Sequence, residues 1–137
     1  MPFVIDASIA GAWILPDEAN ALADGCQSAL AVDHALVPAV WWFEVRNLLI
    51  VSERRGRLDR ATTGKALDII ATYPIVQDNL PDGTALLDLA RAHGLTACGA
   101  AYLELAIRAK VPLATLDKRL AAAALSKNVP PFTSGGQ

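Results

Sequence analysis

The amino-acid sequence predicts an α/β fold of three layers, in which helices cover both faces of a mainly parallel sheet. Short apolar runs alternate with segments of helical spacing along the chain, the pattern expected of such a sheet. The chain has 137 residues, the usual size of one domain, and contains no internal repeat or linker. We therefore expect a single domain over residues 1–137, with a loose tail at about 133–137.

The first part of the chain predicts a strand, two helices and a possible second strand. Residues 2–6, PFVID, form a short apolar run that ends in a carboxylate and indicates a buried strand. A helix is expected from Ser8 to Leu15, because the proline that follows cannot continue it. Residues 18–31 predict a second helix. Residues 35–38, ALVP, indicate either a strand or the approach to the next helix.

The middle of the chain predicts two helices and a short strand. Residues 40–55 have apolar side chains at helical spacing, which places on one face Trp41, Val45, Leu48 and Leu49. The next helix is expected over residues 59–72, with Asp59 as its N-cap. Residues 74–77, PIVQ, indicate a short strand.

The last part of the chain carries clear helix boundaries. Asp82 and Thr96 are suitable N-caps, and Gly94 is a suitable end for the first of these two helices. The expected elements are helices at 82–93 and 97–109, a strand at 111–116, a helix from 117 to 125 and a strand at 129–132. Prolines 130 and 131 restrict that last strand to an edge of the sheet.

Composition narrows the classes of function. Apolar residues make up 53% of the chain and charged residues 19%, which predicts that extra apolar surface is covered in a dimer or by a partner. The net charge of −2 argues against a protein that coats nucleic acid without a specific site. Cys26 and Cys98 are too few for a disulfide framework, and we expect buried free thiols. The chain shows no signal peptide or membrane span, which predicts a cytoplasmic protein.

Three acidic residues stand where an ordinary solvated position is not the obvious interpretation. Asp6 ends the first apolar strand and Asp117 follows the strand at 111–116, and the carboxyl ends of parallel strands meet at one edge of a sheet. Glu44 follows an apolar stretch within a helix, where an acid is costly to bury unless it is paired or binds a cation. Carboxylates plus a substrate phosphate suit Mg²⁺. Helix capping is the alternative for both aspartates, and an ion pair is the alternative for Glu44.

These residues belong to motifs that resemble the PIN-domain ribonucleases, of the VapC toxin type found in toxin–antitoxin pairs. The motifs are, in order, residues 4–8 (VIDAS), 43–49 (FEVRNLL), 94–96 (GLT), 100–106 (AAYLELA) and 112–120 (PLATLDKRL). Each motif alone has low specificity, whereas their order and intervals together are specific to the family. The resemblance runs over nearly the whole chain.

The resemblance implies a metal-dependent endoribonuclease with a four-acid site. In the family the acids bind Mg²⁺ or Mn²⁺ and position the attacking water, and three of them correspond here to Asp6, Glu44 and Asp117. Small polar residues that support the acids or the phosphate correspond to Ser8, Asn47 and Thr115. The fourth acid corresponds to Gly99, within Cys98-Gly99, where the family usually has Tyr-Asp.

Glycine offers no ligand, so we expect weak metal affinity and impaired nuclease activity. Gly99 is interpreted as an engineered substitution, as a natural loss of activity, or as a change for which Glu104 compensates. Compensation is the least favoured, because Glu104 lies about 1.4 helical turns beyond Gly99. The alternative function is a non-catalytic PIN module that binds RNA or a protein.

The resemblance also implies an RNA substrate and a VapB-like antitoxin, in a homodimer or a toxin–antitoxin hetero-oligomer. Trp13 is the candidate for the antitoxin contact, because the family's apolar grooves near the first helices receive an antitoxin segment. Four arginines cluster near the end of the helix at 40–55, and we interpret them as a solvated surface rather than as an RNA contact: Arg54, Arg55, Arg57 and Arg60.

Overall fold

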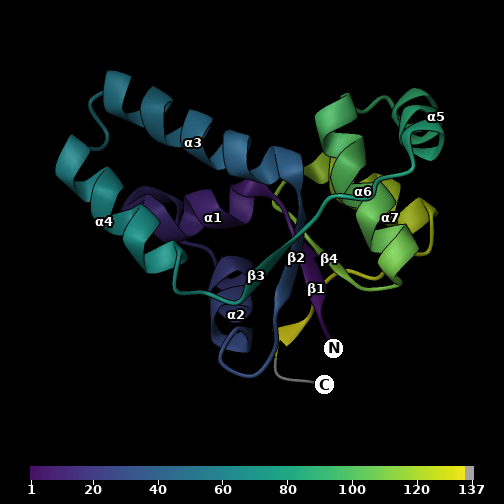
Figure 1. Ribbon diagram of the computed structural model, residues 1–137, viewed down its shortest axis with the longest axis horizontal. Coiled ribbons are helices and arrows are strands. Elements are labelled where there is room, and N and C mark those ends of the chain that lie inside the picture. The colour runs from purple at the N-terminus through teal and green to yellow at the C-terminus, as the bar shows by residue number, and fades with distance from the viewer. Residues whose placement is uncertain (135–137) are drawn as a thin grey trace.

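In the computed structural model, which describes residues 1–134, four parallel strands lie between two groups of helices. The strands are β1 (Phe3–Ile5), β2 (Ala35–Pro38), β3 (Ile75–Asp78) and β4 (Leu113–Ala114). The helices are α1 (Ala7–Ile14), the 3₁₀-helix η1 (Pro16–Glu18), α2 (Ala21–Ala29), α3 (Ala39–Arg54), α4 (Arg60–Ile70), α5 (Gly83–His93), α6 (Ala97–Ala109) and α7 (Lys118–Ser126). Figure 1 shows α1 to α4 on one side of the strands and α5 to α7 on the other. The predicted three-layer α/β/α fold is confirmed.

The strand order is β3-β2-β1-β4, and every pairing is parallel. β1 therefore lies between β2 and β4. The strands run in the same direction, so the segments that follow these three neighbours leave the sheet at one edge. That edge receives Asp6 after β1, α3 after β2 and the loop to α7 after β4.

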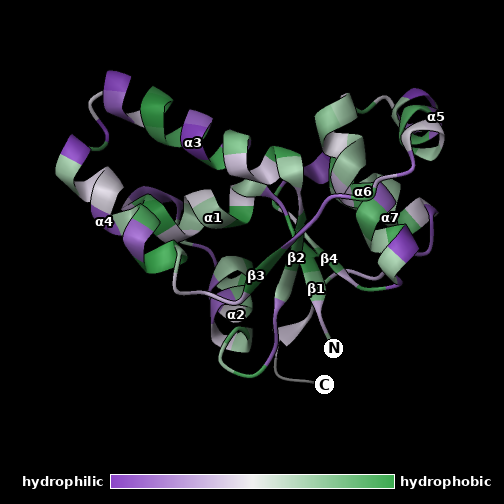
Figure 2. Cartoon of the chain, in the orientation of Figure 1, coloured by the Kyte–Doolittle hydropathy of each residue, from purple (hydrophilic) through white to green (hydrophobic). Residues whose placement is uncertain are grey.

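The core is apolar and continuous through the sheet. Phe3, Val4 and Ile5 of β1 are each at most 1% exposed, and Figure 2 shows hydrophobic colour along the central strands. α6 contacts both β1 and β2 and packs against α5 and α7. Residues 100–106 of α6 are all buried, so this part of the helix is covered on all sides. Within residues 1–134 no helix is both long and apolar enough to cross a bilayer.

Several predicted boundaries are wrong, for local reasons. The helix expected at 18–31 begins only at Ala21, because Asn20 caps it and residues 16–18 form a separate 3₁₀ turn. The strand expected at 111–116 is reduced to Leu113–Ala114. The strand expected at 129–132 is a single bridge between Leu113 and Pro131. The last three residues of the predicted tail, 135–137, lie outside the described range.

Candidate functional site

Asp6 lies at the point where β1 passes into α1. Its carboxylate caps α1 by accepting a hydrogen bond from the backbone N–H of Ser8 (3.1 Å). It also accepts hydrogen bonds from the hydroxyls of Ser8 (2.5 Å) and Thr115. The predicted capping role is therefore real, and Asp6 is only 6% exposed. Capping leaves carboxylate lone pairs free, so it is compatible with a metal ligand.

Burial makes the Asp6 carboxylate unfavourable in its charged form. Loss of solvent raises the pKa of Asp6 above its usual range, and the hydrogen bonds from Ser8 and Thr115 offset this only in part. The ion pairs found among residues 1–134 include none of Asp6, Glu44 and Asp117. A buried acid without a basic partner is a common feature of functional sites and suits a bound cation.

Asp117 is joined to Asp6 through Thr115. The Thr115 hydroxyl donates to Asp6 and accepts from the backbone N–H of Asp117 (3.0 Å). The Ser8 hydroxyl in turn accepts from the backbone N–H of Leu116 (3.0 Å), which fixes the β4–α7 loop against the start of α1. The Asp117 side chain is exposed and caps α7 through Oδ1. The loop thus fixes the backbone from which the second carboxylate projects.

Glu44 is held by a residue that sequence analysis did not single out. Tyr102 of α6, only 2% exposed, donates its hydroxyl hydrogen bond to Oε1 of the half-buried Glu44 on α3. Burial, and then the bond to Glu44 and the charges of Glu44 and Asp6, raise the pKa of Tyr102 far above its usual range. Tyr102 therefore remains a donor at every working pH. A buried tyrosine hydroxyl needs a polar partner, and that was the available signal.

Gly99 lies one helical turn before Tyr102, on the same side of α6. Its N–H bonds to the capping hydroxyl of Thr96 (3.0 Å), and its φ angle is not positive. A Cβ atom at this position would lie 3.4 Å from Thr96 Oγ1 and 3.9 Å from Leu95 Cβ. Both distances are ordinary contacts, so the backbone does not require glycine here. The fold therefore accommodates a Cβ atom at position 99.

Two separate hydrogen-bonded groups hold the three acids, and the acids do not form a closed cage. Within residues 1–134 no group of three or more His, Cys, Asp and Glu side chains is arranged to hold a metal ion. Thr115 ties Asp6 to the backbone of Asp117, and Tyr102 separately holds Glu44. Mg²⁺ keeps several waters and needs only one or two carboxylates plus a phosphate, so this donor set suits a hydrated ion. Asn47 is exposed on α3, and its supporting role stays a prediction.

Glu104 is committed elsewhere. Arg108 binds it through Nε (2.7 Å) and Nη2 (3.1 Å), and also binds Asp78 (3.0 and 3.2 Å). Glu104 is 4% exposed within this network, so it does not replace the side chain missing at Gly99. Asp78 ends β3 and was not predicted as a candidate, although its position resembles that of Asp6. Arg108 holds the pKa of Asp78 below its usual range, which marks a paired structural acid.

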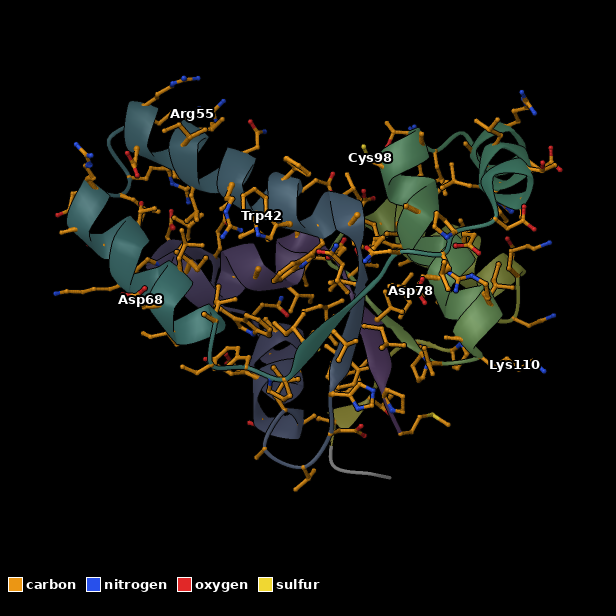
Figure 3. All side chains as sticks on the ribbon, in the orientation of Figure 1. Trp42, Arg55, Asp68, Asp78, Cys98 and Lys110 are labelled. Atoms are coloured by element: carbon orange, nitrogen blue, oxygen red, sulfur yellow. The ribbon has the colours of Figure 1, made fainter. Side chains whose placement is uncertain are left out.

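Three further predictions concern residues around the site. The Trp13 indole donates to the Ala23 carbonyl (2.8 Å) and meets the Tyr73 ring edge-on, so Trp13 packs α1 against α2; its antitoxin contact stays a prediction. Arg57 pairs with acids on η1, in keeping with a surface role. Cys98 was expected to be buried, and this is wrong: it is exposed at the end of α6 shown in Figure 3.

Three comparisons place the chain among known proteins. The sequence matches the family described as PIN domain over residues 3–125. Ribonuclease VapC3 of Pyrobaculum aerophilum is 33% identical over 131 residues, which span 88% of this chain and 93% of that protein. The crystal structure of PAE2754 from Pyrobaculum aerophilum aligns with a TM-score of 0.70 over 90% of this chain and 87% of that one. At 24% identity, this last likeness concerns the fold alone.

Proposed function

Because this chain belongs to the PIN-domain family, we propose that it is a VapC-like endoribonuclease toxin that depends on Mg²⁺ or Mn²⁺. The observation that carries the proposal is Asp6, a buried carboxylate with a raised pKa and no ion-pair partner among residues 1–134. Such an acid lowers the stability of the fold, and a divalent cation would offset that cost. The segments that follow β2 and β4 bring two more acids to the same edge of the sheet.

Each acid has a role in RNA hydrolysis that follows from its surroundings. Asp6 and Asp117 would bind the metal, since Thr115 ties the Asp6 carboxylate to the backbone from which the Asp117 side chain projects. Glu44 would act as a third ligand or orient the attacking water, since one of its oxygens is occupied by Tyr102. When bound, the metal supplies an activated water and neutralises charge on the phosphodiester. Ser8 and Thr115 keep Asp6 in place throughout.

The glycine at position 99 sets the expected level of activity. Removing one carboxylate from a site for a divalent cation lowers both the charge and the number of ligands. We expect weak metal binding and low cleavage as the chain stands. This observation also favours the second candidate function, a non-catalytic PIN module that binds RNA or a protein partner.

RNA cleavage by matched variants distinguishes the two functions. The protein is incubated with single-stranded RNA and Mn²⁺ as it stands, as Gly99→Asp and as Gly99→Asn. Gly99→Asn adds a side chain of the same size without its charge. We expect Gly99→Asp to cleave at least tenfold faster than the other two, and Asp6→Asn in the Gly99→Asp protein to abolish cleavage. Equal background rates in all four proteins would refute the nuclease function and leave the binding module.

We also propose that a VapB-like antitoxin binds this chain. The assembly is either a homodimer of the chain or a hetero-oligomer of the chain with the antitoxin. The support is an apolar stripe on α3, where the side chains of Phe43 and Ile50 are 66% and 42% exposed. They are seven residues apart, so they lie on one helix face. The mass of the purified chain in solution tests self-association, and we expect a dimer. A monomer whose mass does not change when the antitoxin is added would contradict both forms of assembly.

A further inference from the structure

The contact between Tyr102 and Glu44 joins two helices that come from opposite sides of the sheet. α3 begins after β2, whereas α6 lies on the side formed by α5, α6 and α7. Tyr102 is 2% exposed and its ring is fixed by the packing of α6 against β1 and β2. Its hydroxyl therefore meets Glu44 from a buried, packed position, whereas Glu44 itself is only half-buried on α3.

We propose that Tyr102 is a positioning residue, which holds Oε1 of Glu44 so that the other carboxylate oxygen is directed to the metal and its water. The inference rests on the proposed function. It assigns a role to a side chain that does not itself reach the metal.

The geometry explains why the hydroxyl matters more than the ring. A glutamate has three rotatable bonds, and binding a metal with a free glutamate costs the entropy of fixing them. The hydrogen bond from Tyr102 fixes these bonds before the metal arrives. Partners that orient metal ligands in this way typically change metal affinity by 10- to 100-fold when they are removed.

Tyr102 also relates Glu44 to position 99, where the fourth acid of the family is missing. Gly99 precedes Tyr102 by one turn of α6, so a side chain at position 99 would lie on the same helix face. An aspartate at position 99 would project from α6, and the bond between Tyr102 and Glu44 holds α6 against α3. Tyr102 would then set the distance between this aspartate and Glu44.

The test uses Tyr102→Phe, which removes the hydroxyl and keeps the ring. Tyr73→Phe is the matched control, because the Tyr73 hydroxyl also makes a side-chain hydrogen bond (2.6 Å to Gln27). The partners of Tyr73 are Gln27 on α2 and Trp13 on α1, and Figure 1 shows both helices on the other side of the sheet from α6. Both substitutions are made in the unaltered chain and in the Gly99→Asp protein. Mn²⁺ affinity is measured by calorimetry, and the melting temperature is measured without metal.

We expect Tyr102→Phe to weaken Mn²⁺ binding about tenfold and Tyr73→Phe to leave it unchanged. A purely structural role would lower the melting temperature of Tyr102→Phe without this loss of affinity, and that result would overturn the inference. If Mn²⁺ binds to neither the unaltered chain nor Gly99→Asp, the proposed function fails and the inference falls with it. Mn²⁺ binding that persists unchanged in Tyr102→Phe overturns the inference alone.

A second measurement needs no metal. A buried tyrosine hydroxyl that donates to a carboxylate gives a downfield proton resonance protected from exchange. We expect one such resonance that disappears in Tyr102→Phe and moves in Glu44→Gln. Its absence from the unaltered chain would also overturn the inference, since the bond would then not exist in solution.

Discussion

Replacing Asp6 with asparagine separates the stability of the fold from its function. Asparagine caps helices as well as aspartate does, so the bond from the Ser8 N–H is retained. The Thr115 hydroxyl can rotate to accept from the new amide group. What the change removes is a negative charge that is only 6% exposed. We therefore expect Asp6→Asn to stabilise the metal-free protein at pH 7.

The expected gain is on the order of 1 kcal/mol, because the cost of burying the charge exceeds the stabilisation from its hydrogen bonds. For a domain of this size, that corresponds to a rise in melting temperature of roughly 3–5 °C. With Mn²⁺ bound, we expect the unaltered chain to be more stable than Asp6→Asn. A ligand at 100 times its dissociation constant stabilises the folded protein by about 2.7 kcal/mol, and only the aspartate protein receives that stabilisation.

The pH dependence of this gain has a definite direction. Burial raises the pKa of Asp6, so the folded chain holds this proton more tightly than the unfolded chain does. Protonation of Asp6 therefore stabilises the folded chain. This stabilisation is fully present below the pKa of Asp6 in the unfolded chain, about 3.9, and is lost as pH rises through its pKa in the folded chain. The advantage of Asp6→Asn is therefore absent near pH 3 and grows as pH rises through the folded pKa of Asp6.

Thermal melts of both proteins at pH 3 and pH 7, with and without Mn²⁺, provide the assay. Two results would refute the reasoning. One is an Asp6→Asn protein that is less stable than the unaltered chain at pH 7 without metal. The other is an equal stabilisation of both proteins by Mn²⁺.

Two further predictions concern residues outside the group Asp6, Glu44 and Asp117. Arg108→Met leaves Glu104 buried and unpaired, and we expect urea unfolding to show a loss on the order of 2–3 kcal/mol, reduced because Arg108 is 34% exposed. Arg91→Met is its control, since that pair is exposed on both sides, and a similar loss there would contradict the burial argument. Gly94→Ala should cost about 1 kcal/mol, because φ is +62° with no atom within 4 Å of the new methyl group. Gly64→Ala, inside α4 and equally free of contacts, should instead stabilise by about 0.5–1 kcal/mol.

Four helix starts were predictable because their signals are local. Asp59, Asp82, Thr96 and Asp117 all accept a backbone hydrogen bond at the start of the helix that each was predicted to begin. Such a bond depends on only three or four neighbouring residues. The placement of Asp6 and Asp117 was also predictable, because parallel strands place their carboxyl ends together.

What the sequence did not reveal depends on distant contacts. Tyr102 and Glu44 are 58 positions apart, so a buried tyrosine hydroxyl indicates that it needs a polar partner but not which one. The pairing of Asp78 with Arg108 likewise spans 30 positions, so an acid at a strand end was not distinguishable from a ligand. Cys98 was expected inside because cysteine is usually buried, but its position in the first turn of α6 leaves it exposed.

Calorimetric titration with Mn²⁺ tests most directly the claim that Asp6, Glu44 and Asp117 form three corners of a four-acid metal site. The three proteins are the unaltered chain, Gly99→Asp and Gly99→Asn. We expect Gly99→Asp to bind Mn²⁺ at least tenfold more tightly than the unaltered chain does, and Gly99→Asn not to do so. Equal affinities for Gly99→Asp and Gly99→Asn, or none in any of the three, would contradict it.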